Sequence, residues 1–358
     1  MKPLRPFVLL VVLTVSVAFS SSCDTRDKRG VPEADLRVPA DRLPKALLPP
    51  HARVARPNQI SGVVRRVFED TRGNLWFATQ NGILRHDGNA LLYYDFKDPY
   101  GAGVTGTAVV EDPKGNVWLG TTGGLIRYDG SRFATFSRDD GLANDCIWCL
   151  FVDAEGTLWA GTTDGAFRYD GRTFTRFPIP PAGRSDPDRG ISNPTVIHSI
   201  TQDRAGDLWF VNESDVFRFD GTTLARFPVM EGDSPTFVST VLEARNGDLW
   251  FGTWHKGIIR YDGHTFTNVT RQEGLGGVEV GDICQDRTGN LWFPVEGQGV
   301  YRYDGASFTR FYERNGLESH AIFGVTEDRT GRLWFYGFAG TWRYDGRSFV
   351  NVTRDGPW

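Results

Sequence analysis

The chain repeats one pattern of apolar and polar positions seven times. Each copy contains Gly-x-Leu-Trp or Gly-x-Val-Trp, with short apolar runs on either side. The seven tryptophans are Trp76, Trp118, Trp159, Trp209, Trp250, Trp292 and Trp334. Successive spacings are 41 or 42 residues, except for one of 50 between the third and fourth copies. A period of about 40 to 45 residues with several short strands per unit indicates a β-propeller, so seven copies predict seven blades.

Turn residues divide each copy into four strands. The first is an apolar run such as VVRRVFED (63–70), and an Asp-x-x-Gly turn joins it to a second strand such as NLWFAT (74–79). A third strand such as GLIRYDG (124–130) ends on Asp-Gly, which favours a tight hairpin into a fourth strand such as RTFTRF (172–177). The predicted fold is therefore all-β, a seven-bladed β-propeller of four-stranded antiparallel blades spanning residues 58–358.

The N-terminal residues indicate export. A basic start precedes an almost wholly apolar run at 7–19, which is typical of a signal peptide and too short for a membrane-spanning helix. Three serines lead into Cys23, and small residues directly before a cysteine resemble a bacterial lipobox, in which the cysteine becomes lipidated. Residues 1–22 are therefore predicted to be a lipoprotein signal peptide and Cys23 a lipid anchor to the cell envelope. An ordinary cleaved signal followed by a free cysteine is the alternative.

The segment from 23 to 57 is charged and rich in proline, and we expect it to be a tether between the membrane and the propeller. Its residues 51–56 could pair as a strand. The chain has 358 residues, of which 40% are apolar and 13% aromatic, enough to form a core. The net charge is −4 and the basic residues are scattered, so no nucleic acid is expected as a partner.

The repeats resemble the two-component regulator propeller repeat, whose pattern is close to I..I.ED..GNLWFGT..GL.RYDG..F..F. The resemblance extends over about residues 60 to 352. It implies a sensor propeller, because members of this family most often lie ahead of a transmembrane helix and a histidine kinase. No such segment follows Trp358, so we expect a stand-alone binding propeller rather than signal transduction by this chain alone.

Residues that recur in every copy are expected to build the blades. The third strands carry an arginine and an aspartate two residues apart, as in Arg85 and Asp87, which predicts turn capping and ion pairs between blades. The Asp-x-x-Gly turns are also assigned to the scaffold, since they lack the dense oxygen spacing of a calcium loop. The fifth copy has Ala244 in place of the turn aspartate, which an indispensable metal site would not tolerate. No metal and no other cofactor is predicted.

Function is expected where the copies differ. One such position lies five residues before the turn aspartate, and we expect it to face the central channel, whereas the apolar residue two positions later faces the core. The varied residues are Arg65, Thr107, Trp148, His198, Ser239, Gly281 and Phe323. The turns between second and third strands share one face with the fourth-to-first connections and also vary; they bring Trp254, His255 and Glu296.

These positions predict a small-ligand or sugar site at one mouth of the channel, because aromatic rings with a few convergent polar groups suit such ligands. The candidate residues are Arg65, Trp148, His198, Trp254, His255, Glu296 and His320. Residues 178–195, which account for the spacing of 50, are predicted to be a Pro-rich flap over the same face or a tolerated insertion. Cys146 and Cys149 form a CxxC on a strand without a second pair, so they, like Cys284, are assigned to the core.

Three classes of function stay open. A non-catalytic module that binds a glycan, another small ligand or an envelope protein is favoured by the repeat family and by the lack of common hydrolase and phosphate-loop motifs. The Gly-x-Leu-Trp-Phe runs also resemble streptogramin lyase, which implies as an alternative a metal-dependent lyase. His198 or His255 would be its base and Glu296 its metal ligand. The third class is a structural protein that uses the sides of its blades.

Overall fold

The computed structural model describes residues 31–33, 37–38, 58–98, 100–142, 145–183, 193–231, 234–271, 279–319 and 321–358. The predicted signal peptide, Cys23, the possible strand at 51–56 and the site candidate His320 lie outside these residues. Among the described residues, no helix has the length and apolar character needed to cross a membrane.

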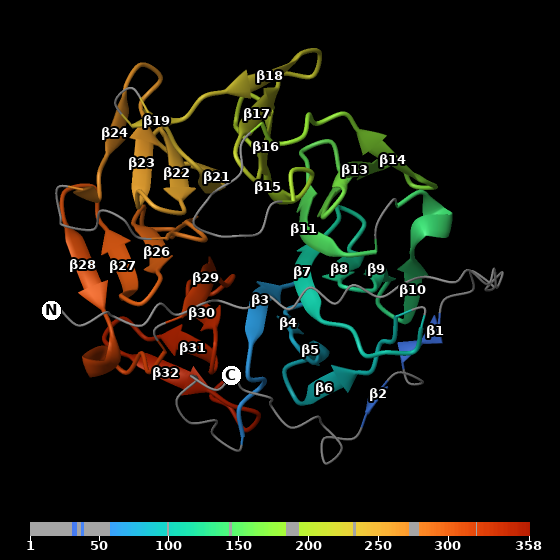
Figure 1. The fold of residues 1–358 in the computed structure, drawn as a ribbon. Helices are drawn as coiled ribbons and strands as arrows, with labels where there is room; N and C mark the ends of the chain where they lie inside the picture. Colours follow the sequence, from blue (N-terminus) through green and yellow to red (C-terminus); the bar gives the residue numbers. More distant parts are fainter. Residues whose placement is uncertain are drawn as a thin grey trace, which may run out of the picture.

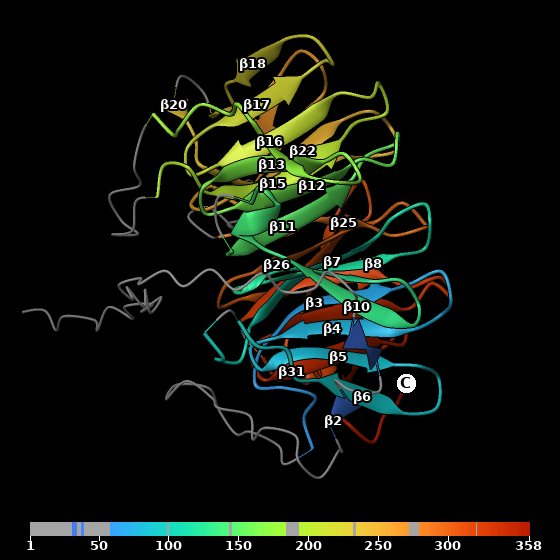
Figure 2. The ribbon, with the colours of Figure 1, turned by 90° about the vertical axis from the view of Figure 1, so that its right-hand side faces the viewer.

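Seven antiparallel sheets surround one axis, which confirms the predicted seven-bladed propeller (Figure 1). In each blade the first strand lies nearest the axis and the other three follow outward in sequence order. Figure 2 shows the same ring from the side. We call the face that carries the second-to-third turns and the fourth-to-first connections the mouth face.

The strands of the first four blades have the following bounds. Blade one contains β3 (Val64–Glu69), β4 (Leu75–Thr79), β5 (Gly82–His86) and β6 (Leu91–Tyr94). Blade two contains β7 (Gly106–Glu111), β8 (Val117–Thr121), β9 (Gly124–Tyr128) and β10 (Arg132–Phe136). Blade three contains β11 (Ile147–Val152), β12 (Leu158–Thr162), β13 (Gly165–Tyr169) and β14 (Phe174–Phe177). Blade four contains β15 (Ile197–Gln202), β16 (Leu208–Asn212), β17 (Val216–Phe219) and β18 (Leu224–Phe227).

Three more blades complete the ring. Blade five contains β21 (Val238–Glu243), β22 (Leu249–Thr253), β23 (Ile258–Tyr261) and β24 (Phe266–Asn268). Blade six contains β25 (Cys284–Gln285), β26 (Leu291–Val295), β27 (Gly299–Tyr303) and β28 (Phe308–Phe311). Blade seven contains β29 (Ile322–Glu327), β30 (Leu333–Gly337), β31 (Gly340–Tyr344) and β32 (Phe349–Val352). Among the described residues, the connections hold two short 3-10 helices, η2 (Arg138–Asp140) and η4 (Glu313–Asn315), and the hairpin β19 (Met230–Glu231) and β20 (Ser234–Pro235).

The Asp-x-x-Gly turn and the tryptophan six residues after its aspartate form one structural unit. In six blades the indole Nε1 donates a hydrogen bond to the turn carboxylate at 2.7 to 2.9 Å. The same carboxylate accepts backbone N–H groups of its own turn, such as those of Arg72 and Asn74 at Asp70. These contacts confirm the predicted scaffold role, because each aspartate satisfies a buried indole and closes its hairpin.

Blade five lacks this hydrogen bond. Ala244 stands at the aspartate position, and Nε1 of the buried Trp250 has no hydrogen-bond partner. We therefore expect Ala244→Asp to raise the free energy of unfolding by about 1 kcal/mol, because the new carboxylate would satisfy the indole N–H. Urea unfolding measures the change. Ala244→Ser, whose hydroxyl is too short to reach the indole, is the control, and an equal gain in both variants would contradict the explanation.

The aspartates that end the third strands cap the following hairpins, as predicted. Asp87 Oδ1 accepts the N–H groups of Asn89 and Ala90 at 3.0 and 2.9 Å, and the other six copies repeat this arrangement. In six of the seven copies these backbone hydrogen bonds are the main cause that lowers the pKa of the carboxyl.

The arginines of the third strands differ from the prediction. The guanidinium of Arg218 lies over the ring of Trp209 in its own blade, 5.8 Å from the centroid, and it pairs with Asp207 of that blade. Arg260 likewise pairs with Asp248 inside blade five, with Nε and Oδ2 2.6 Å apart. The predicted ion pairs between blades are therefore wrong for these copies, because each side chain lies along its own sheet.

Adjacent blades are fastened at another place. In one blade, the residue directly after the turn aspartate (or after Ala244) donates its backbone N–H. The acceptor is the side chain of the residue directly before the turn aspartate (or Ala244) of the next blade. We call these hydrogen bonds, which are 2.6 to 2.8 Å long, the inter-blade clips. They join Thr71 to Glu111, Ala154 to Gln202, Arg204 to Glu243, Arg245 to Gln285, Arg287 to Glu327, and Arg329 to Glu69. Between blades two and three, Pro113 occupies the donor position and Val152 the acceptor position.

Where the ring closes between blades seven and one, the segment before β3 pairs with the chain just after β32 through an antiparallel bridge between Gln59 and Thr353. The clip from Arg329 to Glu69 joins the two blades. The indole of Trp358 stacks on His86, with ring centroids 4.1 Å apart, and packs on Phe77 at 6.0 Å. His86 stands where the other copies have tyrosine or phenylalanine. Trp358 therefore supplies the aromatic ring that this interface would otherwise lack.

Two short pieces of the predicted tether pair with the outer edges of the first two blades. The strand β1 (Val31–Pro32) adds to β10 of blade two, and β2 (Arg37–Val38) adds to β6 of blade one. We call residues 31–33 and 37–38 the N-terminal arm. This part of the segment is attached to the propeller instead of forming a spacer.

Candidate functional site

A β-bulge lies near the mouth-face end of the first strand in six blades. The pairing with the second strand shifts register there, for example between Val64 and Arg66 in blade one. The bulged residues are Arg65, Thr107, Trp148, His198, Ser239 and Phe323. These are six of the seven positions that vary among the copies, and the apolar residue two positions later is buried in every blade, as predicted. Because a bulge re-aims a side chain, the backbone itself singles out these positions.

Some of the bulged residues have structural partners. Thr107 Oγ1 donates a hydrogen bond to the carbonyl of Ile147 at 2.8 Å, and Ser239 Oγ donates to the carbonyl of the next blade's Val280. Phe323 packs edge-on against another phenylalanine of its own blade, with centroids 4.9 Å apart. Function is therefore sought at the other three, Arg65, Trp148 and His198.

Blades three, four and five bring three of the predicted site residues together. His198 meets Trp148 edge-to-face, with ring centroids 5.8 Å apart, and meets Trp254 edge-to-face at 5.2 Å. Trp254 follows β22 directly, is buried, and stacks on Phe237 at 6.2 Å. Trp148 is 42% exposed. We call Trp148, His198, Trp254 and the neighbouring Glu213 the mouth cluster. It extends from the buried indole of Trp254 to the exposed indole of Trp148.

A buried carboxylate orients the histidine of the mouth cluster. Glu213 follows β16 directly, and its Oε2 lies 3.0 Å from His198 Nε2. The side chains of Glu213 and His198 are only 7% and 15% exposed. Nε2 is therefore the ring nitrogen that contacts the carboxyl group, and Nδ1 is the remaining polar atom of the ring. The sequence prediction missed Glu213, although the antiparallel pairing of β15 with β16 places it beside His198.

The other predicted residues occupy neighbouring positions. His255 follows Trp254 in the same turn and is half-buried, and Glu296 is exposed on the corresponding turn of blade six. Arg65 is the bulged residue of blade one; solvent reaches it, but burial by the surrounding protein lowers its pKa. Their part in a ligand site stays a prediction. His198 pairs with Glu213, which the lyase alternative did not include.

Residues 178–183 of the predicted flap lie against the mouth-face turn of blade four. Asn212 Nδ2 donates a hydrogen bond to the carbonyl of Pro180 at 3.1 Å, and the N–H of Gly183 donates to Asp215 Oδ2 at 3.1 Å. The inserted segment therefore begins on the same face as the mouth cluster, in agreement with the predicted position.

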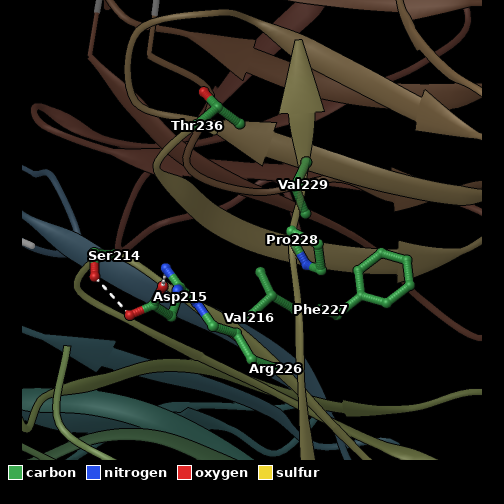
Figure 3. A pocket seen from close by; sticks show the side chains of 8 residues that line it. All are labelled: Ser214, Asp215, Val216, Arg226, Phe227, Pro228, Val229 and Thr236. Carbon is green, nitrogen blue, oxygen red and sulfur yellow. Dashed lines mark hydrogen bonds and ion pairs between the residues drawn. The ribbon is translucent and has the colours of Figure 1, made fainter. Parts of the chain in front are cut away.

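A small hollow at this turn is lined by polar groups that already have partners (Figure 3). Asp215 accepts hydrogen bonds from Gly183 N and from Ser214 Oγ, the latter at 2.8 Å, and forms an ion pair with Arg226. Burial would raise the pKa of Asp215, but these three partners hold it below its usual range. The carboxylate thus fastens the flap and the outer strand β18 to the turn, and we assign the hollow to the structure.

The cysteines behave as packing residues. Cys149 Sγ donates to the carbonyl of Ile197 at 3.6 Å, and burial raises the pKa of its thiol to about 12. Burial also raises the pKa of Cys146, and that of Cys284 to about 12. Such thiols stay protonated near neutral pH and are poor nucleophiles and metal ligands. In the described part of the chain, no group of three or more His, Cys, Asp or Glu side chains could hold a metal ion.

A polar group near the axis joins blades six, seven and one. Arg66 Nη1 donates to Tyr336 Oη at 3.0 Å, and Tyr336 Oη donates to Asp282 Oδ2 at 3.1 Å. The N–H of Val325 donates to the same carboxylate oxygen at 3.3 Å. Burial raises the pKa of Asp282, and the nearby Arg66 opposes this shift. Since these side chains satisfy one another, we assign them to the closure of the ring.

Comparison with known families identifies the repeats. Residues 58–81, 141–164 and 232–255, which fall in blades one, three and five, match the family described as two component regulator propeller. Three of the seven copies therefore match two-component regulator propeller repeats. The matched segments of this propeller include Trp148 and Trp254 of the mouth cluster. No curated protein matches the chain by sequence.

Several solved structures share the propeller fold of this chain. The extracellular domain of a hybrid two component system from B. thetaiotaomicron is 19% identical with a TM-score of 0.59, and the match covers 83% of this chain and 39% of that one. PorZ, a surface component of the type-IX secretion system of Porphyromonas gingivalis, is 19% identical with a TM-score of 0.61, covering 80% and 47%. Virginiamycin B lyase from Staphylococcus aureus is 16% identical with a TM-score of 0.54, covering 71% and 86%. The chain thus spans less than half the length of the first two structures.

Proposed function

We propose that the protein is an exported, non-catalytic binding propeller that takes up a small ligand at the mouth cluster. The observation that carries the proposal is the edge-to-face array of Trp148, His198 and Trp254, with Glu213 buried behind His198. An exposed indole supplies a face for an apolar ring surface, and an oriented imidazole supplies a directed hydrogen bond. A glycan, which combines apolar ring faces with hydroxyl groups, fits this chemistry.

Two further considerations support export. The hybrid two component domain and PorZ are described as an extracellular domain and a surface component, and the signal peptide predicted from the sequence agrees with such a location. We propose that lipid on Cys23 holds the chain to the cell envelope. The intact mass of the protein extracted from membranes tests this, since an unmodified cysteine or a mass that begins elsewhere would disprove the anchor.

The binding proposal is tested with a glycan panel and the purified protein. Ligands are found by thermal shift, and affinities are then measured by calorimetry. We expect Trp148→Ala to weaken binding about 30-fold, equivalent to roughly 2 kcal/mol, because an aromatic contact at the centre of a site carries much of the affinity. Glu213→Gln should weaken binding less, since the amide keeps the shape but can no longer hold His198 as a carboxylate does.

Tyr100→Ala is the matched control for Trp148→Ala. Tyr100 is an aromatic residue with 64% exposure in the connection from blade one to blade two, outside the mouth cluster. The Tyr100→Ala variant should bind the ligand as tightly as the parent chain does. Loss of binding in Tyr100→Ala with retention in Trp148→Ala would place the site elsewhere.

Catalysis is the second candidate and rests on one observation. The His198–Glu213 pair has the geometry of a general base oriented by a carboxylate. An enzyme would convert a bound panel ligand into a product of different mass or structure, and Glu213→Gln would reduce turnover more than binding. If every bound ligand were recovered unchanged, the catalytic candidate would be rejected and only the binding function would remain.

A further inference from the structure

The N-terminal arm inserts a carboxylate between blades one and two. Glu33 Oε1 accepts a hydrogen bond from Tyr94 Oη at 2.7 Å and pairs with Arg85 Nη2 at 2.8 Å, while Oε2 accepts one from Tyr128 Oη at 2.6 Å. The backbone N–H of Glu33 also donates to the carbonyl of Ser131 at 3.1 Å. We call Arg85, Tyr94 and Tyr128 the Glu33 niche.

The niche is built for a carboxylate. Arg85, Tyr94 and Tyr128 are 6%, 0% and 3% exposed, and Glu33 itself is 9% exposed. Burial raises the pKa of both tyrosines, so both hydroxyls keep their protons and can donate. A guanidinium and two hydroxyls therefore face one acceptor-only group. Without Glu33, Arg85 Nη2 and Tyr94 Oη would lose this acceptor, which costs free energy, whereas Tyr128 Oη would keep the carbonyl of Gly130 at 2.9 Å.

The seven copies show that this chemistry is special to one interface. The position of Tyr94 is occupied by Phe136, Phe177, Phe227, Val269, Phe311 and Val352 in the other blades. Only blade one carries a hydroxyl there, and that hydroxyl donates to Glu33. A phenyl ring thus suffices for packing, and the oxygen of Tyr94 is explained by the arm.

We propose that the Glu33 niche, together with the outer edges of β6 and β10, is a docking site for an extended peptide that carries a carboxylate, and that the chain's own N-terminal arm is its ligand. The arm adds β1 to blade two and β2 to blade one, so backbone pairing supplies the extended conformation. Glu33 supplies the specificity, because its carboxylate is the group that the niche recognises.

Docking changes how far the propeller can stand from the point where its N-terminus is attached. From Cys23 to Asn58 the chain could extend about 120 Å, whereas from Cys23 to Val31 it can extend only about 28 Å. With lipid on Cys23, as proposed above, the docked arm keeps the outer edges of blades one and two close to the membrane.

Limited proteolysis of the full-length chain tests the proposal. Trypsin cleaves after Arg37, which pairs as part of β2 while the arm is docked. We expect Glu33→Ala to speed this cleavage about tenfold, because proteolysis follows the population of the open form. Tyr94→Phe should speed it as well, since it removes one donor and leaves the ring that most other blades have. Thermal unfolding of each variant shows that the propeller remains folded.

Tyr93→Phe is the matched control. Its hydroxyl donates to the carbonyl of Asn81 at 2.6 Å in the same blade and makes no contact with Glu33, so cleavage after Arg37 should keep the parent rate. Equal cleavage rates in the parent chain and in Glu33→Ala would overturn the proposal. If protection of Arg37 from trypsin increased with protein concentration and the protein formed a dimer in solution, the arm would dock on a second copy, and its assignment to its own chain would be overturned.

A second measurement tests recognition directly. A synthetic peptide of residues 29–40 is added to full-length Glu33→Ala, in which the niche lacks its carboxylate ligand. We expect the peptide to bind and the same peptide with Glu33→Ala to bind at least about tenfold more weakly. Equal binding of the two peptides, or no binding of either, would contradict a carboxylate-specific docking site.

Discussion

Asp328→Ala is expected to lower the free energy of unfolding by about 3 kcal/mol. Asp328 is 4% exposed and accepts five hydrogen bonds. Four of the donors are the backbone N–H groups of Thr330 and Arg332, Thr330 Oγ1 and Arg332 Nε. The fifth is Nε1 of Trp334, which is fully buried. Removal of the carboxylate leaves the indole N–H without an acceptor and releases the turn. Urea unfolding at pH 7 measures the loss.

The effect of this substitution should depend on pH. Burial would raise the pKa of Asp328, but the hydrogen bonds from Thr330, Trp334 and Arg332 outweigh it and lower the pKa below its ordinary value of 3.8. A carboxyl with a lowered pKa in the folded state stabilises the fold above the unfolded pKa, and this stabilisation is lost as the pH falls through the folded value. The difference between Asp328→Ala and the parent chain should therefore shrink at pH 3 and below. A difference that grows toward acid would contradict this account.

Ala244→Asp makes the opposite change in blade five and serves as the comparison. The two substitutions act on the same position of the repeat, so opposite signs would show that the hydrogen bond to the tryptophan carries the effect. Destabilisation by both variants would instead indicate that neighbouring side chains of each blade decide the outcome.

Gly337→Thr is expected to destabilise the protein by about 3 kcal/mol, although it restores the residue found in most copies. Thr79, Thr121, Thr162 and Thr253 stand at this position in blades one, two, three and five. A Cβ atom at Gly337 would lie 2.7 Å from Cα of Ile322 and would overlap the carbonyl oxygen of Ala321. Both are backbone atoms of blade seven that cannot yield without disturbing the strand. Thermal and urea unfolding measure the loss.

The backbone atoms that approach Gly337 lie next to an unusual mouth-face turn of blade seven. Ala339 has a φ of 66°, and it is the one residue other than glycine with positive φ in the described part of the chain. This turn also takes part in ring closure, because the N–H of Ala339 donates to the carbonyl of Gly62 at 2.8 Å. At Gly337 the backbone of Ala321 and Ile322 leaves room only for glycine.

Val295→Thr in blade six is the matched control for Gly337→Thr. It makes the same residue at the equivalent position, in a turn of the same length as that of blade five. There Thr253 Oγ1 donates to the carbonyl of Gly257 at 2.8 Å, and the new threonine could donate to Gly299 in the same way. We expect its stability to stay within about 1 kcal/mol of the parent chain. A similar loss in both variants would show that close approach at Gly337 is not the reason.

The architecture could be predicted because each of its causes is local and repeated. A tryptophan every 41 or 42 residues and turn residues at fixed offsets define four strands and seven units. The position five residues before the turn aspartate could be found for the same reason, since it coincides with the bulge in six blades. The repeat thus located Trp148 and His198 without any knowledge of the structure.

The partners of these side chains could not be predicted equally well. Glu213 is one of several polar residues in the variable turns, and only its burial and its distance of 3.0 Å from His198 distinguish it. The arginines of the third strands were assigned to contacts between blades, but the side chains of Arg127 and Arg218 lie over the tryptophan of their own sheet. Arg85 does reach the next blade, where it donates a hydrogen bond to Tyr128 Oη. Glu33 lies in a proline-rich segment without periodicity, where no pattern indicates a buried residue.

The inter-blade clips have a consequence for the order of the repeats. Each clip needs a donor N–H in one copy and an acceptor side chain in the next, so two neighbouring copies must match. The copy with Pro113 offers no N–H, and it is followed by the copy with Val152, which has no acceptor. If either copy stood at another place in the ring, a backbone N–H or an acceptor side chain of a neighbouring blade would lack its partner. The blades share one shape but are not interchangeable, and a shuffled or circularly permuted propeller should keep blades two and three adjacent.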